Sequence, residues 1–283
     1  MRIIEKISEM QQQSEAWRRD GRKIMLVPTM GYFHDGHLDL MRKARSLGDI
    51  SVVSIFVNPT QFGVGEDFDR YPRDVDRDFR LASNEGVDVV FLPSSQEMYP
   101  EGFQTYVEVS EVTKPLCGKS RPGHFKGVAT VVVKLFCIVK PHAAIFGEKD
   151  FQQLVTIQRM VQDLNMDVEI VAHPIVREPD GLAMSSRNKY LGAVDRERAL
   201  LLSRSLHEAR RLISSGERNG EEVLRRVREI LDSGGDMKID YVELCRPDDL
   251  KEVSSIGSPT LLALAAYLGH TRLIDNCMLI PKE

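Results

Sequence analysis

Two histidines, His34 and His37, stand three positions apart with Gly36 between them in the stretch PTMGYFHDGHLDLMRKAR, residues 28–45. An apolar run precedes them and an amphipathic pattern follows, which predicts a helix that begins at the pair. Imidazoles at a helix N-terminus can donate hydrogen bonds to phosphate oxygens, and the free backbone N–H groups of the first turn add to such an anion site. Gly31 and Gly36 allow close approach of the backbone. The spacing therefore favours phosphate binding.

The same residues leave two other interpretations of the pair open. A His-x-x-His pair can supply half of a zinc site, although no cluster of cysteine or histidine nearby provides the remaining ligands. Either histidine can also be an ordinary polar group of the core or the surface. The helix dipole disfavours a charged imidazole and a bound phosphate favours one, but both forms keep an N–H to donate.

The elements that must position these groups alternate between apolar strands and helices. The pattern predicts strands at 23–29, 51–59, 87–93, 142–147 and 168–176. The intervening helices are expected at 38–48, 74–86, 128–139 and 150–165. Short strands separated by helices favour parallel pairing. The sequence therefore predicts an α/β fold with a doubly wound, parallel, five-stranded Rossmann-like sheet, and ligands are expected at the carboxyl ends of its strands.

The composition of the chain shifts near residue 180, which indicates a domain boundary. Ahead of that point, residues 94–126 are rich in proline, glycine and aromatic residues, which predicts a long loop with one short strand near Tyr106–Val109. Two charged helices and three strands are expected beyond it, at about 194–214 and 220–232 and in KIDYVELC, PTLLALAAYLG and TRLIDNCML. We therefore expect a Rossmann-like domain at 1–179 and a smaller α+β domain with antiparallel strands at 180–283.

Composition narrows the class of protein. The chain has 283 residues, with 38 basic and 42 acidic side chains and a net charge of −4, so it lacks the broad basic surface that nucleic-acid binding requires. Its four cysteines are far apart and form no C-x-x-C pair, which indicates reduced, mostly structural thiols. The N-terminal stretch does not read as a signal peptide, and no stretch approaches a membrane span. We expect a cytoplasmic protein that binds neither nucleic acid nor membranes.

Six sequence blocks occur in an order that resembles one enzyme family. The tetrapeptide H-D-G-H resembles the H-x-G-H motif of the nucleotidyltransferase superfamily that includes the class I aminoacyl-tRNA synthetases. The blocks are PTMGYFHDGH, FVNPTQFG, YPRD, GHFKGVATVV, FGEKDFQQL and MSSRNKYL. Together they resemble the pantoate–β-alanine ligases, the pantothenate synthetase family, densely over residues 23–191. This family usually has small residues in place of Tyr32 and Phe33, and often Glu in place of Asp35, so the local packing is expected to differ.

The resemblance implies an ATP-dependent, AMP-forming acid–amine ligase. Its reaction condenses (R)-pantoate with β-alanine to pantothenate through a pantoyl-adenylate intermediate and releases AMP and pyrophosphate, as a step towards coenzyme A. ATP is a substrate, and Mg²⁺ is expected to accompany it. The resemblance also implies a homodimer, and we expect the smaller domain to close over ATP.

The resemblance assigns roles to residues at matching positions. It implies a catalytic group composed of His34, His37, Lys149 and Arg187. The ATP site would comprise Met30, Gly31, Tyr32, Phe33, His34, Asp35, Gly36, His37, Gly147, Glu148, Lys149, Asp150, Val176, Met184, Ser185, Ser186 and Arg187. Gln61 and Gln153 would bind pantoate, and Gln61 would also lie at the β-alanine position. Further contacts are implied near the pocket for Tyr71, Arg73, Arg121 and His124.

Residue type alone gives several of these positions an ordinary structural explanation. Met30 can be a core filler, and Asp150 can cap a helix. Ser186 can belong to an ST-turn within the M-S-S-R cluster. Gln153 can be a solvated helix residue. Asp78 is a possible contact for Mg²⁺, and it can equally be an exposed acid on its helix.

Three other functions are weighed against the ligase. A nucleotidyltransferase would stop at the adenylate or make a dinucleotide, but the glutamines of NPTQF and DFQQL suit a small hydroxy acid. A tRNA synthetase is disfavoured by length, acidic balance and the lack of a basic anticodon-binding domain. A nucleotide sensor would bind ATP without releasing pyrophosphate when pantoate is supplied.

Overall fold

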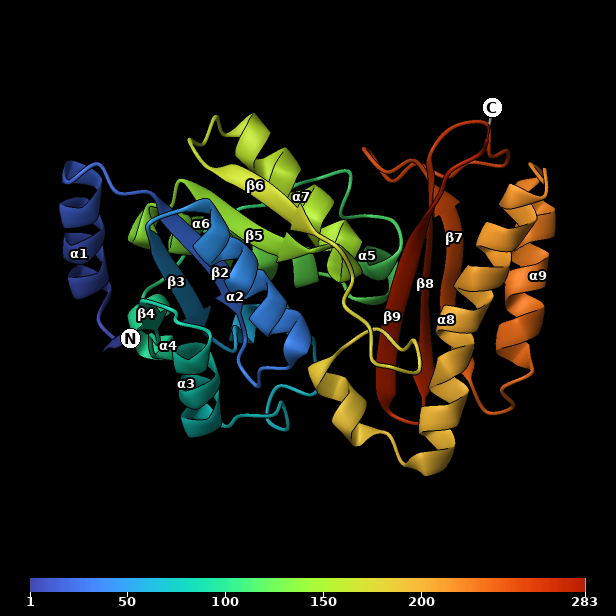
Figure 1. Cartoon of the computed structure of the whole chain (residues 1–283), viewed down its shortest axis with the longest axis horizontal. Helices are drawn as coiled ribbons and strands as arrows, with labels where there is room; N and C mark the ends of the chain where they lie inside the picture. The colour runs from blue at the N-terminus through green and yellow to red at the C-terminus, as the bar shows by residue number, and fades with distance from the viewer. Residues whose placement is uncertain (283) are drawn as a thin grey trace. The chain divides into compact units, whose positions relative to one another are not determined.

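The computed structural model describes residues 1–282, which divide into two compact units. The first unit contains residues 1–109, 121–148 and 156–174. The second contains residues 110–120 and 149–155 and the chain from residue 175 onward. Each unit has its own sheet, drawn as arrows in Figure 1.

A six-stranded parallel sheet forms the centre of the first unit, in the order β1-β4-β3-β2-β5-β6. Its strands are β1 (Arg2–Ile4), β2 (Ile24–Thr29), β3 (Ile50–Ile55), β4 (Val89–Phe91), β5 (Ala143–Gly147) and β6 (Glu169–His173). The predicted doubly wound parallel sheet is confirmed, and the five predicted strands are β2 to β6. The sixth strand, β1, was not predicted; it has three residues and pairs with β4.

Helices cover the sheet because its central strands are apolar on both faces. They are α1 (Ile7–Arg19), α2 (Asp35–Leu47), α3 (Val75–Asn84), α4 (Ser95–Met98) and α6 (His124–Val139). Met25 and Val27 of β2 pack with Leu38 and Met41 of α2 in one core cluster, to which α3 also contributes. Figure 1 shows α2 crossing in front of the strands. Helices α1 and α6 pack against each other and against β2.

The prediction of a short strand near Tyr106–Val109 is wrong, because these residues pair with no strand in the structure. The N–H of Val107 donates instead to the Thr130 hydroxyl of α6, 3.0 Å away. A side-chain acceptor thus takes the place of a neighbouring strand. This contact keeps the segment close to α6 without regular secondary structure.

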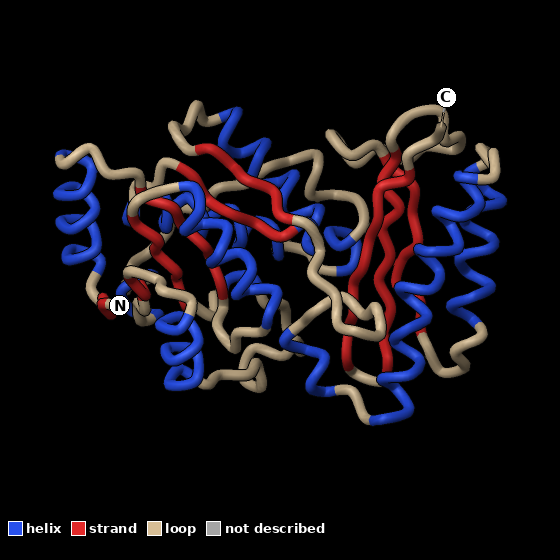
Figure 2. The backbone as a smooth tube through the Cα atoms, in the orientation of Figure 1, coloured by secondary structure: helices blue, strands red, loops and turns tan. Residues whose placement is uncertain are grey.

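The second unit has a three-stranded antiparallel sheet in the order β7-β8-β9 (Figure 2). Its elements are α5 (Cys117–Ser120), α8 (Ala193–Ser214), α9 (Gly220–Asp232), β7 (Lys238–Cys245), β8 (Thr260–Leu268) and β9 (Thr271–Leu279). A two-residue turn at Gly269 and His270 joins β8 to β9, and Gly269 has a positive φ of 57°. Such turns match the twist of the flanking strands. The predicted antiparallel α+β arrangement is confirmed. Helix α7 (Phe151–Asp163) begins in the second unit and ends in the first.

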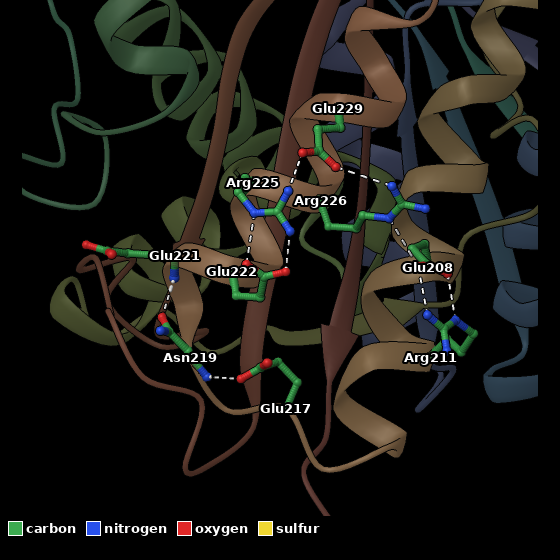
Figure 3. Close-up of polar contacts among 9 residues, drawn as sticks. All are labelled: Glu208, Arg211, Glu217, Asn219, Glu221, Glu222, Arg225, Arg226 and Glu229. Carbon is green, nitrogen blue, oxygen red and sulfur yellow. Dashed lines mark hydrogen bonds and ion pairs between the residues drawn. The ribbon is translucent and has the colours of Figure 1, made fainter.

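Helices α8 and α9 pack on one face of this sheet and carry ion pairs on their outer side (Figure 3). Glu208 of α8 pairs with Arg211 on its own helix and with Arg226 of α9. Arg226 also pairs with Glu229. Exposed pairs of this kind contribute little to stability individually, so the buried apolar contacts hold the two helices on the sheet.

The four cysteines are free thiols. Cys117, Cys245 and Cys277 are buried, and burial raises the pKa of Cys245 to about 12 and that of Cys277 to about 11. Cys137 is exposed on α6 although its helix is largely apolar. Within residues 1–282, no helix is long and apolar enough to cross a membrane.

Candidate active site

The histidine pair lies where the strand order of the first unit reverses. From β2 the chain proceeds to β3 and β4 on one side of the sheet, and later to β5 and β6 on the other. The carboxyl ends of β2 and β5 therefore flank the switch point, which is the usual ligand position in open α/β sheets. His34 and His37 follow β2, and Gly147 and Glu148 lie at the end of β5.

A tight turn carries the chain from β2 to the histidines. Gly31 has a φ of 82° and Tyr32 has a φ of 52°, so two consecutive residues occupy the left-handed region. A Cβ on Gly31 would lie 3.0 Å from both Asp78 Oδ2 and Ile55 Cγ2, so only glycine fits without a shift. Phe33 is fully buried in the core. Core packing thus accommodates Phe33, one of the two bulky residues that distinguish this turn from the family pattern, and Tyr32 is half-buried.

The two histidines contact each other at the N-terminus of α2, the helix that the sequence predicts to begin at the pair. His34 is the N-cap residue, and its backbone N–H donates to Nδ1 of His37 across 3.3 Å. Their ring centroids are 4.0 Å apart. Because Nδ1 of His37 accepts a hydrogen bond, the proton of its neutral ring lies on Nε2. Asp35 is exposed in the first turn, and Gly36 leaves that turn open to the approach of an anion.

Gln61 and Met30 lie next to each other after adjacent strands. Gln61 ends the short 3₁₀ helix η1 (Pro59–Gln61), and its side-chain amide N–H contacts the sulfur of Met30 at 3.2 Å. Asn58, fully buried, donates to the Gln61 side-chain oxygen at 3.0 Å. Sequence reasoning missed Asn58, although its place inside the NPTQF block was a usable signal. The structure thus fixes the Gln61 amide with its N–H side towards Met30.

Arg121 and His124 hold the backbone of Gln61. The Gln61 carbonyl accepts from His124 Nδ1 at 2.8 Å and from the Arg121 guanidinium at 3.3 Å. Arg121 also forms two hydrogen bonds with Glu66, at 2.5 and 2.6 Å. Burial alone would raise the pKa of Glu66, but the hydrogen bonds and charge of Arg121, together with a backbone hydrogen bond from Gly63 and the charge of His124, hold the pKa below its usual range. Glu66 was not among the predicted site residues.

A cavity of about 250 Å³ opens in the first unit at the carboxyl ends of β2, β3 and β4. Its lining includes Met30, Gly31, Tyr32 and Asp78 from the predicted set. The guanidinium of Arg73, which also lines it, donates to the backbone carbonyls of Phe68 and Tyr71. Tyr71 itself is buried. These contacts fix the wall of the cavity that the YPRD block forms.

Asp78 is buried, so the alternative interpretation of this residue as an exposed acid on its helix is wrong. Its side chain is 1% exposed, and its two oxygens accept hydrogen bonds from the backbone N–H groups of Tyr32 and Phe33. Among residues 1–282, no group of three or more His, Cys, Asp or Glu side chains is arranged to hold a metal ion. The visible role of Asp78 is therefore to hold the turn before the histidines.

The other predicted nucleotide residues belong to the second unit. The Lys149 carbonyl accepts from the Asn276 side chain at 3.0 Å. Asp150 ends the 3₁₀ helix η2 (Glu148–Asp150) and directly precedes Phe151, the first residue of α7, so the expectation that it caps a helix stays a prediction. Gln153 is half-buried, whereas its neighbour Gln152 is buried and bonds to the backbone of the 112–117 segment.

The M-S-S-R cluster forms a compact turn. Ser185 is the N-cap of the 3₁₀ helix η3 (Ser186–Tyr190), and its hydroxyl accepts from the N–H of Arg187 at 3.3 Å. The capping role expected of Ser186 therefore falls on Ser185, and Ser186 is buried. The N–H of Met184 donates to the carbonyl of Val176 at 3.0 Å. Backbone and side-chain contacts thus fix the whole cluster.

The prediction that Val176 closes the fifth predicted strand is wrong. That strand, β6, ends at His173, and the next residue is Pro174, whose ring nitrogen has no hydrogen for a strand ladder. Val176 pairs instead with the cluster at Met184. Its backbone thus belongs to the turn of the second unit.

An ion pair missed by sequence reasoning anchors this turn. Arg177 donates to both oxygens of Asp275, at 2.7 and 2.9 Å, and also to the carbonyl of Gly181 at 3.0 Å. Asp275 is only 2% exposed. Glu178 accepts from the side chain of Asn188 at 2.6 Å. The Arg177–Asp275 pair joins residues far apart in the sequence and carries no local spacing signal, so only the folded structure reveals it.

Comparison with known proteins identifies the family. A family model described as pantoate-beta-alanine ligase matches residues 2–278. A pantothenate synthetase of Syntrophobacter fumaroxidans is 65% identical over 281 residues, covering 99% of each chain. One of Geobacter sulfurreducens is 58% identical over 283 residues, covering 100% of both.

Solved structures agree with that result. The pantothenate synthetase of Thermus thermophilus has a TM-score of 0.95 at 44% identity, covering 99% of this chain and 100% of its own. The pantoate-beta-alanine ligase of Francisella tularensis, complexed with beta-gamma ATP and beta-alanine, has a TM-score of 0.81 at 36% identity and covers 98% and 97%. The resemblance carried by the six sequence blocks is confirmed, and the chain belongs to the pantoate-beta-alanine ligase family.

Proposed function

We propose that this ligase condenses (R)-pantoate with β-alanine in two steps, through a pantoyl adenylate. In the first step a pantoate carboxylate oxygen attacks the α-phosphorus of ATP, and pyrophosphate leaves. In the second step the β-alanine amine attacks the acyl carbonyl, AMP leaves with the bridging oxygen, and the amine loses its proton. Membership of the family supports the overall reaction, and the Francisella tularensis relative in complex with beta-gamma ATP and beta-alanine supports the substrates.

The observation that carries the mechanism is the histidine pair at the switch point of the sheet. His37 holds Nε2–H as a donor, because its Nδ1 accepts from the backbone of His34. A donor at a helix N-terminus stabilises the negative charge that develops on phosphate oxygens during adenylyl transfer. We assign this role to His37, with His34 and the backbone of residues 30–36 as further ATP contacts. Positioning and charge neutralisation suffice for this reaction without a protein nucleophile.

Gln61 is proposed to bind pantoate and to lie at the β-alanine position, with Gln153 as a second pantoate contact. Its side-chain oxygen accepts from Asn58, and its backbone is held by Arg121 and His124. A buried amide fixed in this way has one defined orientation, which suits recognition of a hydroxy acid. The contacts of Arg121 and His124 support a role in positioning Gln61.

Further ATP contacts are proposed for the residues that follow β5 and for the M-S-S-R cluster. Lys149 and Arg187 would neutralise phosphate charge, with Arg187 able to donate two parallel hydrogen bonds. The remaining contacts are Gly147, Glu148, Asp150, Val176, Met184, Ser185 and Ser186. We also propose that residues 1–179 bind the nucleotide and pantoate and that residues 180–283 close over ATP.

Mg²⁺ is proposed to bind with ATP. The described residues contain no three-ligand cluster, and both Asp78 oxygens accept backbone N–H groups, so phosphate oxygens and water fit the metal better than a protein cage. Bound there, Mg²⁺ would neutralise phosphate charge. We further propose a homodimer located in the cytoplasm, where ATP is available.

A product assay tests this function. The purified chain is incubated with pantoate, β-alanine, ATP and Mg²⁺, and the products are separated by chromatography. Pantothenate, AMP and pyrophosphate are expected in equal amounts. ADP with inorganic phosphate would contradict adenylation. Adenylate or dinucleotide without pantothenate would favour a nucleotidyltransferase, and ATP binding without pyrophosphate release would favour a sensor.

A further inference from the structure

Helix α3 reaches the turn before the histidines with two adjacent charged residues. Asp78 accepts the N–H of Tyr32 on Oδ2 at 2.6 Å and the N–H of Phe33 on Oδ1 at 2.7 Å. Arg77 donates to the carbonyl of Phe33 at 2.8 Å. Its guanidinium also lies 5.3 Å from the centre of the Tyr32 ring. One helix thus binds both the donors and an acceptor of the same turn.

The backbone of this turn requires outside support. Tyr32 adopts a φ of 52°, a left-handed conformation that is unfavourable for a residue with a side chain. Together with Gly31 at 82°, it turns the successive N–H groups of Tyr32 and Phe33 towards the same carboxylate. Such an arrangement of N–H groups binds an anion, and here the anion is the side chain of Asp78.

One peptide unit connects this support to the catalytic pair. The peptide between Phe33 and His34 has its carbonyl bonded to Arg77 and its N–H bonded to Nδ1 of His37. Rotation of this peptide would break the hydrogen bond that places the His37 proton on Nε2. The orientation of the peptide and the tautomer of His37 are therefore linked.

We propose that Arg77 and Asp78 are positioning residues for adenylation, which fix the Phe33–His34 peptide and through it the Nε2–H tautomer of His37. This inference rests on the proposed role of His37 as a donor to phosphate. It gives Asp78 a function other than metal binding, and it assigns a function to the half-buried Arg77. Neither residue needs to touch a substrate.

The energetics of Asp78 agree with a positioning role. Burial raises the pKa of Asp78 above its ordinary value, although the hydrogen bonds from Phe33 and Tyr32 oppose the shift. A carboxylate buried to 1% exposure is costly to keep charged, and its nearest cation, the Arg77 guanidinium, is 4.0 Å away. Asp74 is the other charged group that acts on it and adds to the cost. The chain therefore retains a charged group at a cost, and that charge accepts both N–H groups of the turn.

Two substitutions on α3 test the proposal, each with a matched control on the same helix. Asp78→Asn keeps the shape of the side chain but leaves one of the two N–H groups without an acceptor, and Arg77→Met keeps the stem but removes the donor. Asp76→Asn and Arg80→Gln remove the same charges from exposed positions of α3. Circular dichroism and the unfolding temperature establish that each variant is folded. Asp78→Glu, which keeps the carboxylate, serves as the conservative variant if Asp78→Asn fails to fold.

The first measurement is nitrogen-15 NMR of the histidine rings, which does not depend on activity. The His37 signal is assigned by its loss in His37→Gln. In the parent chain and both controls, the two ring nitrogens of His37 should have well-separated shifts, typical of a single Nε2–H tautomer. In Asp78→Asn and Arg77→Met the two shifts should move towards each other as the tautomers mix. Unchanged shifts in both variants would overturn the proposal.

The second measurement is pantoate-dependent exchange of pyrophosphate into ATP. We expect kcat to fall about 10- to 100-fold in both variants while KM for ATP changes much less, because a misoriented donor loses contact with the transition state. A decrease in kcat that is no larger than the fraction of unfolded protein explains would contradict a positioning role. A higher Mg²⁺ requirement in Asp78→Asn than in Asp76→Asn would instead indicate a metal ligand. If the parent chain shows no exchange, the proposed function fails, while the NMR result still decides whether the tautomer depends on α3.

Discussion

The backbone N–H of His34 donates to Nδ1 of His37, 3.3 Å away, at the first turn of α2. This single contact determines which ring nitrogen of His37 carries the proton in the neutral state. The other nitrogen, Nε2, is therefore a donor beside the N–H groups of a helix N-terminus. The geometry thus gives the H-x-G-H motif a physical reason for its spacing.

Replacement of His37 by alanine tests the proposed donor. We expect kcat for pantoate-dependent pyrophosphate exchange to fall about 10²- to 10³-fold, because the variant loses one hydrogen bond to charge that develops in the transition state. His207→Ala, an exposed histidine on α8, should retain full activity. Exchange in His37→Ala within a factor of about three of the parent rate would contradict the assignment.

Arg187→Ala tests the proposed role of the M-S-S-R cluster. A guanidinium that holds polyphosphate should contribute to both ATP binding and pyrophosphate departure, so kcat/KM for ATP should fall about 100-fold or more. Steady-state kinetics with varied ATP give this value. Arg204→Ala removes an exposed arginine of α8 and should leave kcat/KM unchanged. Catalysis that persists undiminished in Arg187→Ala would remove this cluster from the ATP site.

The Glu66–Arg121 pair predicts a pH-dependent contribution to stability. Arg121 holds the pKa of Glu66 below 4.5 in the folded state, so the pair stabilises the fold above pH 4.5, and this contribution is lost as pH falls through the folded pKa. Glu66→Gln should lower the urea midpoint of the chain at about pH 7, through a loss of about 1–2 kcal/mol, and much less near about pH 3. Glu101→Gln, an exposed acid of the same unit, is the control. An equal loss at both pH values would show that the charge of Glu66 is not the cause.

The Arg177–Asp275 pair predicts a structural contribution to the turn that carries the M-S-S-R cluster. Arg177→Met leaves the buried carboxylate of Asp275 without its cation, and removal of one partner of a buried pair costs about 3–5 kcal/mol. We expect a lower unfolding midpoint and a higher KM for ATP. The double substitution Arg177→Met with Asp275→Leu should recover part of the stability but not the KM. Recovery of neither stability nor KM would show that the pair acts in some other way.

Local patterns predicted the parts of the fold that are governed by burial. Two apolar runs correctly predicted β2 and β3 of the sheet. The helical spacing of Leu38 and Met41 correctly predicted the helix that covers them. The three-residue strand β1 was missed because its stability comes from pairing with β4, which no local pattern records. Pro174 was a signal that the strand prediction through Val176 did not use.

In the candidate site, too, local patterns predicted some residues, while others are brought in only by the fold. The turn at residues 31–37 was predictable, because its glycines and histidines can be recognised by residue type and spacing. Asp78 lies 41 positions beyond His37 in sequence, and its contact with the turn arises only when α3 packs beside α2. The buried amide of Gln152 and the half-buried one of Gln153 are adjacent and identical in type, so only the fold separates them.

Transfer of oxygen from pantoate to AMP tests the adenylation mechanism most directly. Pantoate labelled with oxygen-18 in its carboxylate is incubated with the chain, ATP, Mg²⁺ and β-alanine, and the AMP is isolated for mass spectrometry. Attack of the carboxylate on the α-phosphorus predicts one labelled oxygen in each AMP. Unlabelled AMP, or label in inorganic phosphate together with ADP, would contradict a pantoyl-adenylate intermediate.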